Sequence, residues 1–406
     1  MRFERFVTRR FLPRERNSFS TPLVDIAVCS IALGVLVMVM AVSILLGFQN
    51  EIKDKVVGFG SHIVVTGIEQ NDGYMATPIE RDRPVFAVLE SHNGVEHIQF
   101  YAEKGGMVKT AESIHGMILK GVDANYDTTF FASNLVKGRM FSLADTVPSN
   151  EVIVSQSIAS KLCLGIGDKL PTYFWQDNNY RARAFTIAGI YNTDMMEFDD
   201  HYVLGDLRQV QRLNNWNPNL VEGCEIKLRD FGRLPSTAQE IYNQLDYDLN
   251  LTTITEQQPS LFAWLRLLDS NIVLILTVMA VVCVVAIVSS LLIMIFEKTQ
   301  TIGILKTMGC RDSSIRKIFM LKAATIIMKG VVIGDAVALL LSALQTRFHL
   351  VSLDSESYSM SFVPVYINGW HYVAISVGTV AVCLAALLIP ATTIAKVQPA
   401  KTIRVE

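Results

Sequence analysis

Long apolar runs with few or no charges divide this chain of 406 residues. One run covers residues 26–48, and three more cover residues 270–296, 323–344 and 370–389. Each is long enough to cross the hydrocarbon core of a bilayer, which takes about 20 apolar residues in a helix. Between the first and second runs lies a long stretch with the composition of an ordinary folded domain. The pattern predicts an integral membrane protein with four transmembrane helices and one large water-exposed module.

The first run lacks the features of a cleaved signal peptide. It is longer than the apolar region of a signal peptide, which has about 7–15 residues. It also continues into the sequence GFQNE at 47–51 without a small-residue cleavage site. We therefore interpret residues 24–48 as a retained membrane span.

The predicted transmembrane helices cover residues 24–48, 269–296, 323–345 and 370–389. The remaining parts are a basic N-terminus at 1–23, the module at 49–268, loops at 297–322 and 346–369, and a tail at 390–406. Helical patterns at 50–57 and 260–269 flank the module. We expect these two helices to enter and leave it as a stalk.

Lysine and arginine residues set the predicted orientation, because short basic segments stay in the cytoplasm. They cluster before the first span, between the second and third, and after the fourth: Arg2, Arg5, Arg9, Arg10, Arg14, Arg16, Lys298, Lys306, Arg311, Arg316, Lys317, Lys322, Lys396, Lys401 and Arg404. The 346–369 loop has only Arg347. Both termini are therefore predicted to be cytoplasmic, with the module on the other side. The net charge of −2 gives no indication of nucleic-acid binding.

Short alternating and amphipathic patterns predict a mixed α/β module. Strand patterns lie at 62–66, 97–102, 106–110, 117–121, 151–154, 169–174, 184–191 and 224–228, and helical patterns at 85–89, 157–162, 207–213 and 234–245. Ser155 or Ser157, and Asp206, mark helix starts. A change of composition at 137–150 predicts a boundary between two subdomains at about 50–140 and 150–250.

No residue constellation indicates an enzyme. The phosphate-binding GxxxxGK[ST] loop, the GxSxG elbow and the HExxH zinc motif are absent, so this chain is not expected to hydrolyse ATP. The acidic cluster at 195–201 (MMEFDDH) offers carboxylates for Ca²⁺ or acid–base chemistry, but a solvated turn between two strands explains it better. We predict no catalytic residue, bound cofactor or metal site.

Only two cysteines, Cys163 and Cys224, fall on the predicted outer side of the membrane. A disulfide between them would be stable in an oxidising compartment. Two separate free thiols fit the sequence equally well.

The cytoplasmic loop at 297–322 contains a short helical pattern that ends at a glycine. Its residues are Thr301, Ile302, Gly303, Ile304, Leu305, Lys306, Thr307, Met308 and Gly309. Gly309 stands where a left-handed helix end is expected, and Asp312 or Ser313 is predicted to cap the helix that continues into the third span. A short helix with an apolar face outside the bilayer suits the groove of a partner protein. The alternative is an interfacial turn.

The third span combines two ionisable residues with a stripe of small ones. Small residues recur every four positions at Gly330, Gly334, Ala338 and Ser342, which permits close helix packing within or between protomers. Lys329 is expected to extend toward the cytoplasmic surface rather than serve a function. Asp335 lies nearer the middle of the membrane and is expected to have a partner on another helix.

Several segments resemble lipoprotein-releasing (Lol-type) ABC transporter permeases, within the FtsX-like and MacB-like permease superfamily. They lie at both termini and around all four spans: 6–12 (FVTRRFL), 17–20 (NSFS), 31–35 (IALGV), 47–52 (GFQNEI), 256–259 (EQQP), 297–299 (EKT), 302–309 (IGILKTMG), 389–391 (IPA) and 397–400 (VQPA). The resemblance is weaker through the module. It implies a MacB-like periplasmic domain of two subdomains inserted between helices 1 and 2.

The resemblance also implies a mechanism. The permease would dimerise, as a homodimer or heterodimer, in the inner membrane of a Gram-negative bacterium. It would pair with a separate cytoplasmic ATPase, which holds the ATP and Mg²⁺ and docks on Thr301–Met308 as a coupling helix. ATP-driven motion would lift a lipoprotein from the outer leaflet and pass it to a periplasmic carrier. The expected lipid-facing cavity is lined by Val39, Met40, Ile44, Val278 and Val282.

The sequence departs from the family at one place. Some members carry a longer hairpin that hooks the carrier, whereas the matching region here, residues 169–183, is short. The resemblance therefore does not extend to carrier docking by this chain.

Three other functions compete with lipoprotein extraction. A mechanotransmitting permease that exports peptides or drugs usually has its ATPase fused before the first span, where this sequence has residues 1–23. A permease that regulates cell-wall hydrolases tends to have a much smaller outer domain. A membrane-tethered enzyme has no supporting residues.

Overall fold

The computed structural model of the protein describes residues 20–68, 77–110, 113–143, 147–176, 179–354, 358 and 360–391. Its contacts divide it into two units. The helical unit consists of Met1–Gln49, Trp264–Val351 and Val363–Glu406, and the sheet unit of Asn50–Ala263 and Ser352–Phe362. The basic residues predicted at 1–16 and 396–404 lie outside the described residues.

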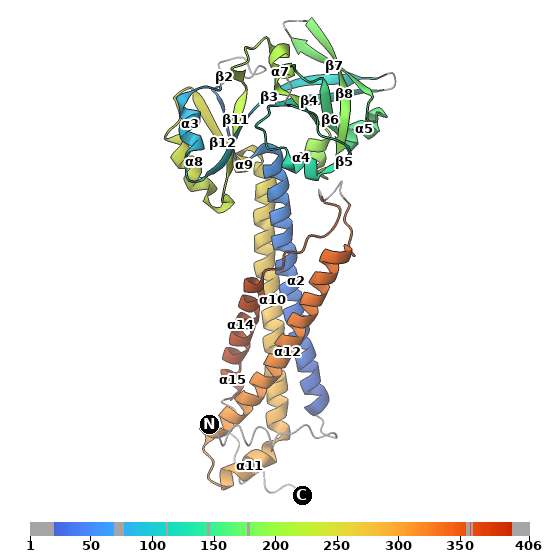
Figure 1. The fold of residues 1–406 in the computed structure, drawn as a ribbon. Coiled ribbons are helices and arrows are strands. Elements are labelled where there is room, and N and C mark those ends of the chain that lie inside the picture. The colour runs from blue at the N-terminus through green and yellow to red at the C-terminus, as the bar shows by residue number, and fades with distance from the viewer. Residues whose placement is uncertain are drawn as a thin grey trace. The chain divides into compact units, whose positions relative to one another are not determined.

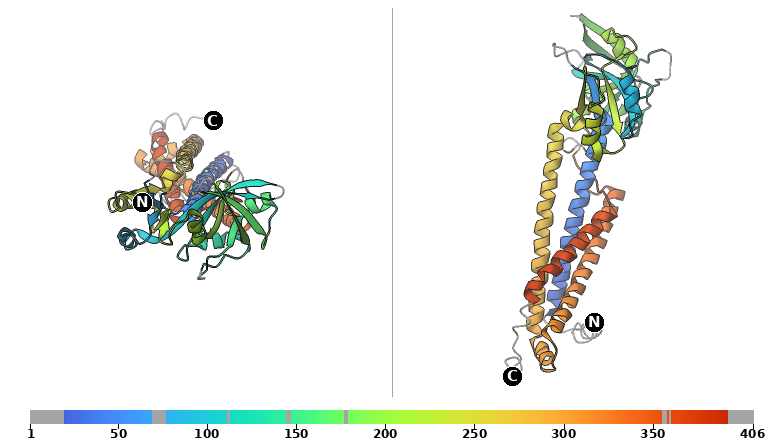
Figure 2. Two further views of the ribbon diagram at one scale, coloured as in Figure 1. Left: turned by 90° about the horizontal axis from the view of Figure 1, so that it is seen from above. Right: turned by 90° about the vertical axis from the view of Figure 1, so that its left-hand side faces the viewer.

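The helical unit contains long helices that lie beside one another (Figures 1 and 2). Its elements are α2 (Ser20–Gly60), α10 (Pro259–Glu297), α11 (Thr299–Thr307), α12 (Asp312–Phe348), α14 (Gly369–Ala386) and α15 (Leu388–Ala391). Among the described residues, α2, α10, α12 and α14 are long and apolar enough to cross a membrane. The predicted spans are thus confirmed as helices, and α2, α10 and α12 extend well beyond them. The chain is a membrane protein.

The core of the helical unit is made by apolar side chains from all the long helices. Ile31 and Val35 of α2, Ile287 of α10 and Ile327 of α12 are among its buried residues. Many apolar side chains of α10 point outward instead, including Val273 and several others with about half or more of their surface exposed. Such exposure suits contact with lipid rather than water.

The sheet unit is mixed α/β and is organised around one ten-stranded sheet. The path β12–β1–β11–β3–β4–β9–β6–β8–β5 contains β12 (Leu249–Thr253), β1 (Ile63–Gly67), β11 (Gly223–Leu228), β3 (Val95–Lys109), β4 (Ile114–Val122), β9 (Tyr202–Asp206), β6 (Glu151–Ser155), β8 (Asn179–Tyr191) and β5 (Leu135–Gly138), and β7 (Lys169–Gln176) pairs with β3 and β8. A separate pair joins β2 (Ile79–Glu80) to β10 (Leu220–Val221). The β4–β9 and β6–β8 pairs are parallel and the others antiparallel.

Short helices pack on this sheet or connect its strands. They are α3 (Pro84–Glu90), α4 (Thr129–Ser133), α5 (Gln156–Leu162), α6 (Met196–Asp199), α7 (Leu207–Asn214), α8 (Leu234–Tyr242) and α9 (Ile254–Gln257), with a 3₁₀ turn η1 (Phe231–Arg233). Ser155 and Asp206 cap α5 and α7, because their side chains accept hydrogen bonds from the Ile158 and Arg208 amides. Both predicted helix starts are confirmed.

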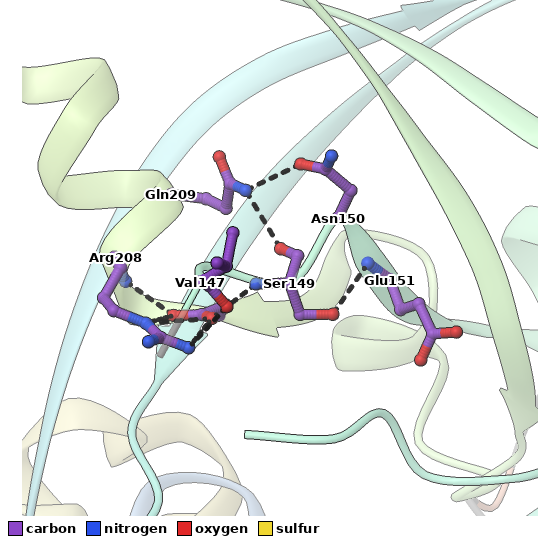
Figure 3. A network of polar contacts seen from close by, with 7 residues as sticks. Val147, Ser149, Asn150, Glu151, Arg208 and Gln209 are labelled. Carbon is purple, nitrogen blue, oxygen red and sulfur yellow. Dashed lines mark hydrogen bonds and ion pairs between the residues drawn. The ribbon is translucent and has the colours of Figure 1, made fainter. Parts of the chain in front are cut away.

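The predicted boundary at 137–150 does not separate two sheets. Strands from both sides of it alternate in the sheet, where β4 is paired with β9. The loop before β6 is also tied to the start of α7, as Figure 3 shows. The Ser149 amide donates to Asp206 Oδ2 (2.8 Å), and Gln209 Nε2 donates to the Ser149 carbonyl (3.0 Å) and to Asn150 Oδ1 (2.7 Å). Within this stretch, residues 137 and 138 end β5, and Ser149 and Asn150 are fixed to α7 by these hydrogen bonds. Turn-forming residues are common in such connections as well as at domain boundaries.

The segment between α12 and α14 contributes to the sheet unit. Ser352 forms an isolated β-bridge with Phe362, and Met360 is buried. The Ser361 hydroxyl donates to Asp194 Oδ2 (2.7 Å), which also lies 3.8 Å from Lys55 Nζ of α2. Part of the predicted 346–369 loop is therefore bound to the module.

Candidate functional site

The predicted coupling helix is α11, which ends one residue earlier than predicted. Ile302, Gly303 and Leu305 are buried against the other helices. Ile304 and Met308, four positions apart on the opposite face, are 55% and 70% exposed. Residues four apart lie on one face of a helix, so α11 presents an apolar surface while its other side fixes it to the helical unit.

A tight turn joins α11 to α12. Gly309 has φ +84°, its amide donates to the Lys306 carbonyl (3.0 Å), and the Cys310 amide donates to the Leu305 carbonyl (3.0 Å). These two bonds and the left-handed glycine form a Schellman motif. The predicted left-handed helix end is confirmed.

The start of α12 differs from the prediction in how it is capped. Arg311 is the N-cap residue, and its side chain makes no capping hydrogen bond. Asp312 instead lies inside the first turn, where its Oδ1 is 3.0 Å from Lys306 Nζ of α11. The prediction that Asp312 or Ser313 caps this helix was therefore wrong, because the turn is one residue shorter than expected. A carboxylate in the first turn still interacts favourably with the helix dipole.

The small-residue stripe of α12 packs against α2. Gly330, Gly334, Ala338 and Ser342 are all buried. A Cβ added at Gly334 would lie 2.6 Å from the Ala32 carbonyl oxygen, and one added at Gly330 would lie 2.8 Å from Ile31 Cβ. The stripe is therefore a packing face within this chain. Ser342 Oγ lies 3.0 Å from Tyr372 Oη, which links the same face to α14.

The residues predicted to line a lipid cavity do not share one surface. Val39 is completely buried in the helical core, and Met40 packs against that core. Ile44 is half-buried, whereas Val278 and Val282 of α10 are 48% and 45% exposed. Val39 therefore does not lie on an open surface of this chain. A lipid-facing cavity that includes the other four residues stays a prediction.

The two ionisable residues of α12 have different surroundings. Asp335 has a partner on another helix, as predicted, because Ser376 Oγ of α14 donates to its Oδ2 (2.7 Å). Lys329 is exposed on the surface of α12. Its extension toward the cytoplasmic surface stays a prediction.

The two long helices α2 and α10 are connected in sequence to two adjacent strands of the sheet, β1 and β12. β1 begins three residues after α2 ends, and β12 is followed directly by α9 and then by α10. β1 and β12 are antiparallel neighbours, with Ile63 opposite Thr253 and Gly67 opposite Leu249. Thr253 and Glu256 form a reciprocal capping box at the start of α9. The chain therefore enters and leaves the sheet side by side.

The last turn of α2 is embedded in the sheet unit through Phe59. Its ring stacks on Phe198 with 4.5 Å between ring centroids, and it meets Tyr202 (4.7 Å) and Phe131 (5.5 Å) edge to face. Phe59 is 3% exposed. A cavity of about 270 Å³ lies beside it, lined by residues of α2, the sheet and α9, including Glu103, Lys120 and Glu225.

Charged groups beside Phe59 are buried and interact with one another. Lys120 Nζ lies 2.5 Å from Glu225 Oε1, and each side chain is 2% exposed. Burial lowers the pKa of Lys120, but the charges of Glu225 and Glu103 outweigh it and the net direction is upward. Burial, together with the charge of Glu103, raises the pKa of Glu222 to about 7. Lys120 is therefore held as a cation in a region of excess carboxylate.

The acidic cluster at 195–201 has a structural role. It forms α6 between β8 and β9, as the prediction of a turn between strands requires. Asp199 is buried rather than solvated, and its carboxylate accepts from the Thr193 amide (3.0 Å) and hydroxyl (2.7 Å). Burial raises its pKa to about 6. Among the described residues, no group of three or more His, Cys, Asp or Glu side chains could hold a metal ion.

Cys163 and Cys224 are free cysteines, the first exposed and the second buried. The alternative of a disulfide between them is therefore wrong. Cys163 occupies a left-handed position at the end of α5 (φ 53°), and Cys224 lies within β11 in the sheet core.

The short region at 169–183 forms the hairpin of β7 and β8. Trp175 and Tyr180 pair across its end with 4.7 Å between ring centroids, and both are more than half exposed. Residues 177 and 178 at its tip lie outside the described residues.

Sequence reasoning missed Phe59, Lys120 and Glu225. Their contacts join segments 61 to 105 positions apart, which local patterns do not reveal. One signal was present. Lys120 interrupts the apolar stretch MILKGV at 117–122, and near-continuous apolar runs are typical of strands buried on both faces.

The comparisons with known proteins cover almost the whole chain. A match to the MacB-like periplasmic core domain family covers residues 26–243, and one to the FtsX-like permease C-terminal family covers residues 273–399. The "Lipoprotein-releasing system transmembrane protein LolC" of Neisseria meningitidis serogroup B is 22% identical over 99% of each chain. The protein of that name from Xylella fastidiosa strain Temecula1 is 21% identical over 97% of this chain and 96% of its own. The "Lipoprotein-releasing system transmembrane protein LolE" of Haemophilus influenzae is 22% identical over 96% of each.

Proposed function

Because the chain belongs to the MacB-like periplasmic core domain family and carries an FtsX-like permease C-terminal region, we propose that it is the permease subunit of a lipoprotein-releasing ABC transporter. It extracts lipoproteins from the outer leaflet of the inner membrane of a Gram-negative bacterium and releases them toward a periplasmic carrier. The observation that carries this proposal is the end-to-end similarity to relatives named for lipoprotein release.

The chain works with partners that supply energy and complete the transport path. A separate cytoplasmic ATPase binds ATP and Mg²⁺ and docks on the face of α11 where the side chains of Ile304 and Met308 are exposed. A second permease protomer, identical or related, completes the dimer. Both termini are cytoplasmic, and the sheet unit is periplasmic. This orientation follows from the basic residues of the 297–322 loop.

Energy input is needed because a lipoprotein is held by its acyl chains. Burial of each CH₂ group is worth about 0.8 kcal/mol, so the removal of two or three chains from the bilayer is far uphill. Continuous helices supply a path for mechanical work. α2 runs unbroken from Ser20 to Gly60 and α10 from Pro259 to Glu297, and each contributes residues to both units.

Depletion of the protein, followed by separation of the inner and outer membranes, tests the proposal. We expect lipoproteins destined for the outer membrane to accumulate in the inner membrane. Re-expression of the natural chain should restore their release, as should the control Gly378→Ala, because a Cβ at Gly378 meets no atom within 4 Å. Normal lipoprotein traffic after depletion would refute the proposal. Loss of peptide or drug export, or of hydrolase activation, would then identify another permease branch.

A further inference from the structure

A positive group near the C-terminal end of α2 would stabilise it, and the helix itself has no basic residue there. The last carbonyls of a helix have no intrahelical partners and carry partial negative charge. The last turn of α2 contains no basic residue. The Ser61 amide donates to the Val57 carbonyl (2.7 Å). The Phe59 carbonyl accepts from Lys120 Nζ at 3.0 Å, so a lysine from β4 provides a cation at this helix end.

Lys120 reaches this carbonyl from a fully enclosed position. Its ammonium group lies 5.1–5.7 Å from the ring centroids of Phe59, Tyr101 and Tyr126. Its side chain is 2% exposed, and Glu225 Oε1 is 2.5 Å away. The ammonium group of Lys120 thus contacts the backbone carbonyl of Phe59, the aromatic ring of Phe59 and the carboxylate of Glu225 in the sheet.

The carboxylate opposite Lys120 is itself fixed. Gln99 Nε2 donates to Glu225 Oε2 (2.8 Å), and Gln99 Oε1 accepts from the Asp127 amide (2.9 Å). Gln99, Lys120 and Glu225 lie on β3, β4 and β11, and β3 is paired with both of the others. The network therefore connects the α2 terminus to three strands at once.

Stability alone does not account for a buried ion pair. Desolvation of two charges is expensive, and apolar residues of similar size often stabilise a core equally well or better. A charged hydrogen bond does, however, fix direction and distance in a way that an apolar contact does not. We propose that Lys120 is a positioning residue, which holds the last turn of α2 in one place on the sheet so that movement of the helix is passed to the whole module. This role rests on the proposed function, because it gives the movement its purpose.

Two variants and a control separate positioning from simple stabilisation. Lys120→Met removes the ammonium group and keeps most of the side-chain volume. Lys120→Met with Glu225→Gln also removes the carboxylate that would otherwise remain buried without a cation. Lys161→Met is the control, because it removes a lysine of the same unit that pairs with Asp200 (2.8 Å) on the surface.

The full chain is reconstituted with its ATPase and second protomer in lipid vesicles that contain a lipoprotein. In every protein compared, the exposed natural cysteines Cys29 and Cys163 are first replaced by serine. Spin labels on Asp54→Cys and Lys109→Cys, both exposed sites in the sheet unit, then report the position of α2 relative to β3 by pulsed electron paramagnetic resonance. We expect both Lys120 variants to broaden the distance distribution. We also expect the lipoprotein released per ATP hydrolysed to fall about tenfold or more, the factor that corresponds to one lost charged hydrogen bond. The control should change neither quantity.

The double variant decides the outcome if Lys120→Met alone misfolds. A double variant that keeps the natural distance distribution and the natural release per ATP would overturn the proposal, because neutral groups would then suffice. The distance measurement does not depend on the substrate. If the natural protein releases no lipoprotein, the proposed function fails, and the label distances still decide the role of Lys120.

Discussion

Substitution of Gly309 by valine tests whether the turn after α11 sets the connection to the ATPase. The glycine has φ +84°, and its amide and that of Cys310 close the Schellman motif. A β-branched residue resists the left-handed region because its Cβ substituents crowd the backbone. We therefore expect Gly309→Val to disturb the angle between α11 and α12 without disturbing the core.

The magnitude follows from the surroundings of Gly309. A Cβ added there meets no atom within 4 Å, so no packing clash contributes. The remaining cost is backbone strain, about 1–2 kcal/mol for an L-residue in this conformation. One to two kcal/mol changes an equilibrium by a factor of about 5–30. We expect the free permease to relieve this strain by opening the turn, so that docking on the ATPase subunit has to restore it. Affinity for the ATPase subunit should therefore fall by that factor, with Gly309→Ala at the low end and Gly309→Asn close to the natural protein, because asparagine tolerates this region.

The assay compares the four proteins in reconstituted vesicles. It measures ATPase-subunit binding, ATP hydrolysis and lipoprotein release, and we expect binding and release to fall in the order Asn, Ala, Val. The thermal stability of the isolated permease serves as the control and should change little. Equal coupling in all four proteins would show that the α11 surface does not dock the ATPase through this turn.

Three further predictions concern packing and charge. Gly334→Leu should lower the thermal stability in detergent by about 1–3 kcal/mol through overpacking, because its Cβ would lie 2.6 Å from a backbone oxygen of α2, whereas Gly378→Leu in open space should not. Phe59→Ala should destabilise the sheet unit by about 3–5 kcal/mol in unfolding of the full chain, and Tyr247→Ala, a 96% exposed control, should have little effect. Burial, with a contribution from Lys227, lowers the pKa of His62 to about 4. The unfolded state therefore binds a proton at a higher pH than the folded state does. The free energy of unfolding should fall by at most about 3 kcal/mol as the pH drops from about 6.5 to 4. His62→Asn should flatten that part of the stability–pH curve.

Sequence patterns predicted the features that depend on local chemistry. The length of apolar runs with few or no charges defined the membrane helices. Gly309 was identified because few other residues take a left-handed helix end. The four-residue spacing of Gly330 and Gly334 predicted a packing face, which the structure places against α2. In each case, the physical cause lies within one or two helical turns of the residue.

The features that sequence did not predict depend on distant partners. Lys120 and Glu225 are 105 positions apart, and neither has a neighbour in sequence that indicates the other. The order of strands also depends on parallel pairs such as β4 with β9, whose connection passes through four other strands. Val39 was assigned to an open surface because helix position alone does not reveal which face a neighbour covers.

The ladder between β1 and β12 restricts how the two long helices can move at the sheet. Its five residue pairs run from Ile63 opposite Thr253 to Gly67 opposite Leu249. A slip of one residue, about 3.4 Å, would turn every side chain of a strand to the wrong face. The ends of α2 and α10 next to the sheet therefore cannot shift along their axes independently of each other. An axial displacement of one helix end is passed to the other through the β1–β12 pair, whereas each helix can still bend along its length.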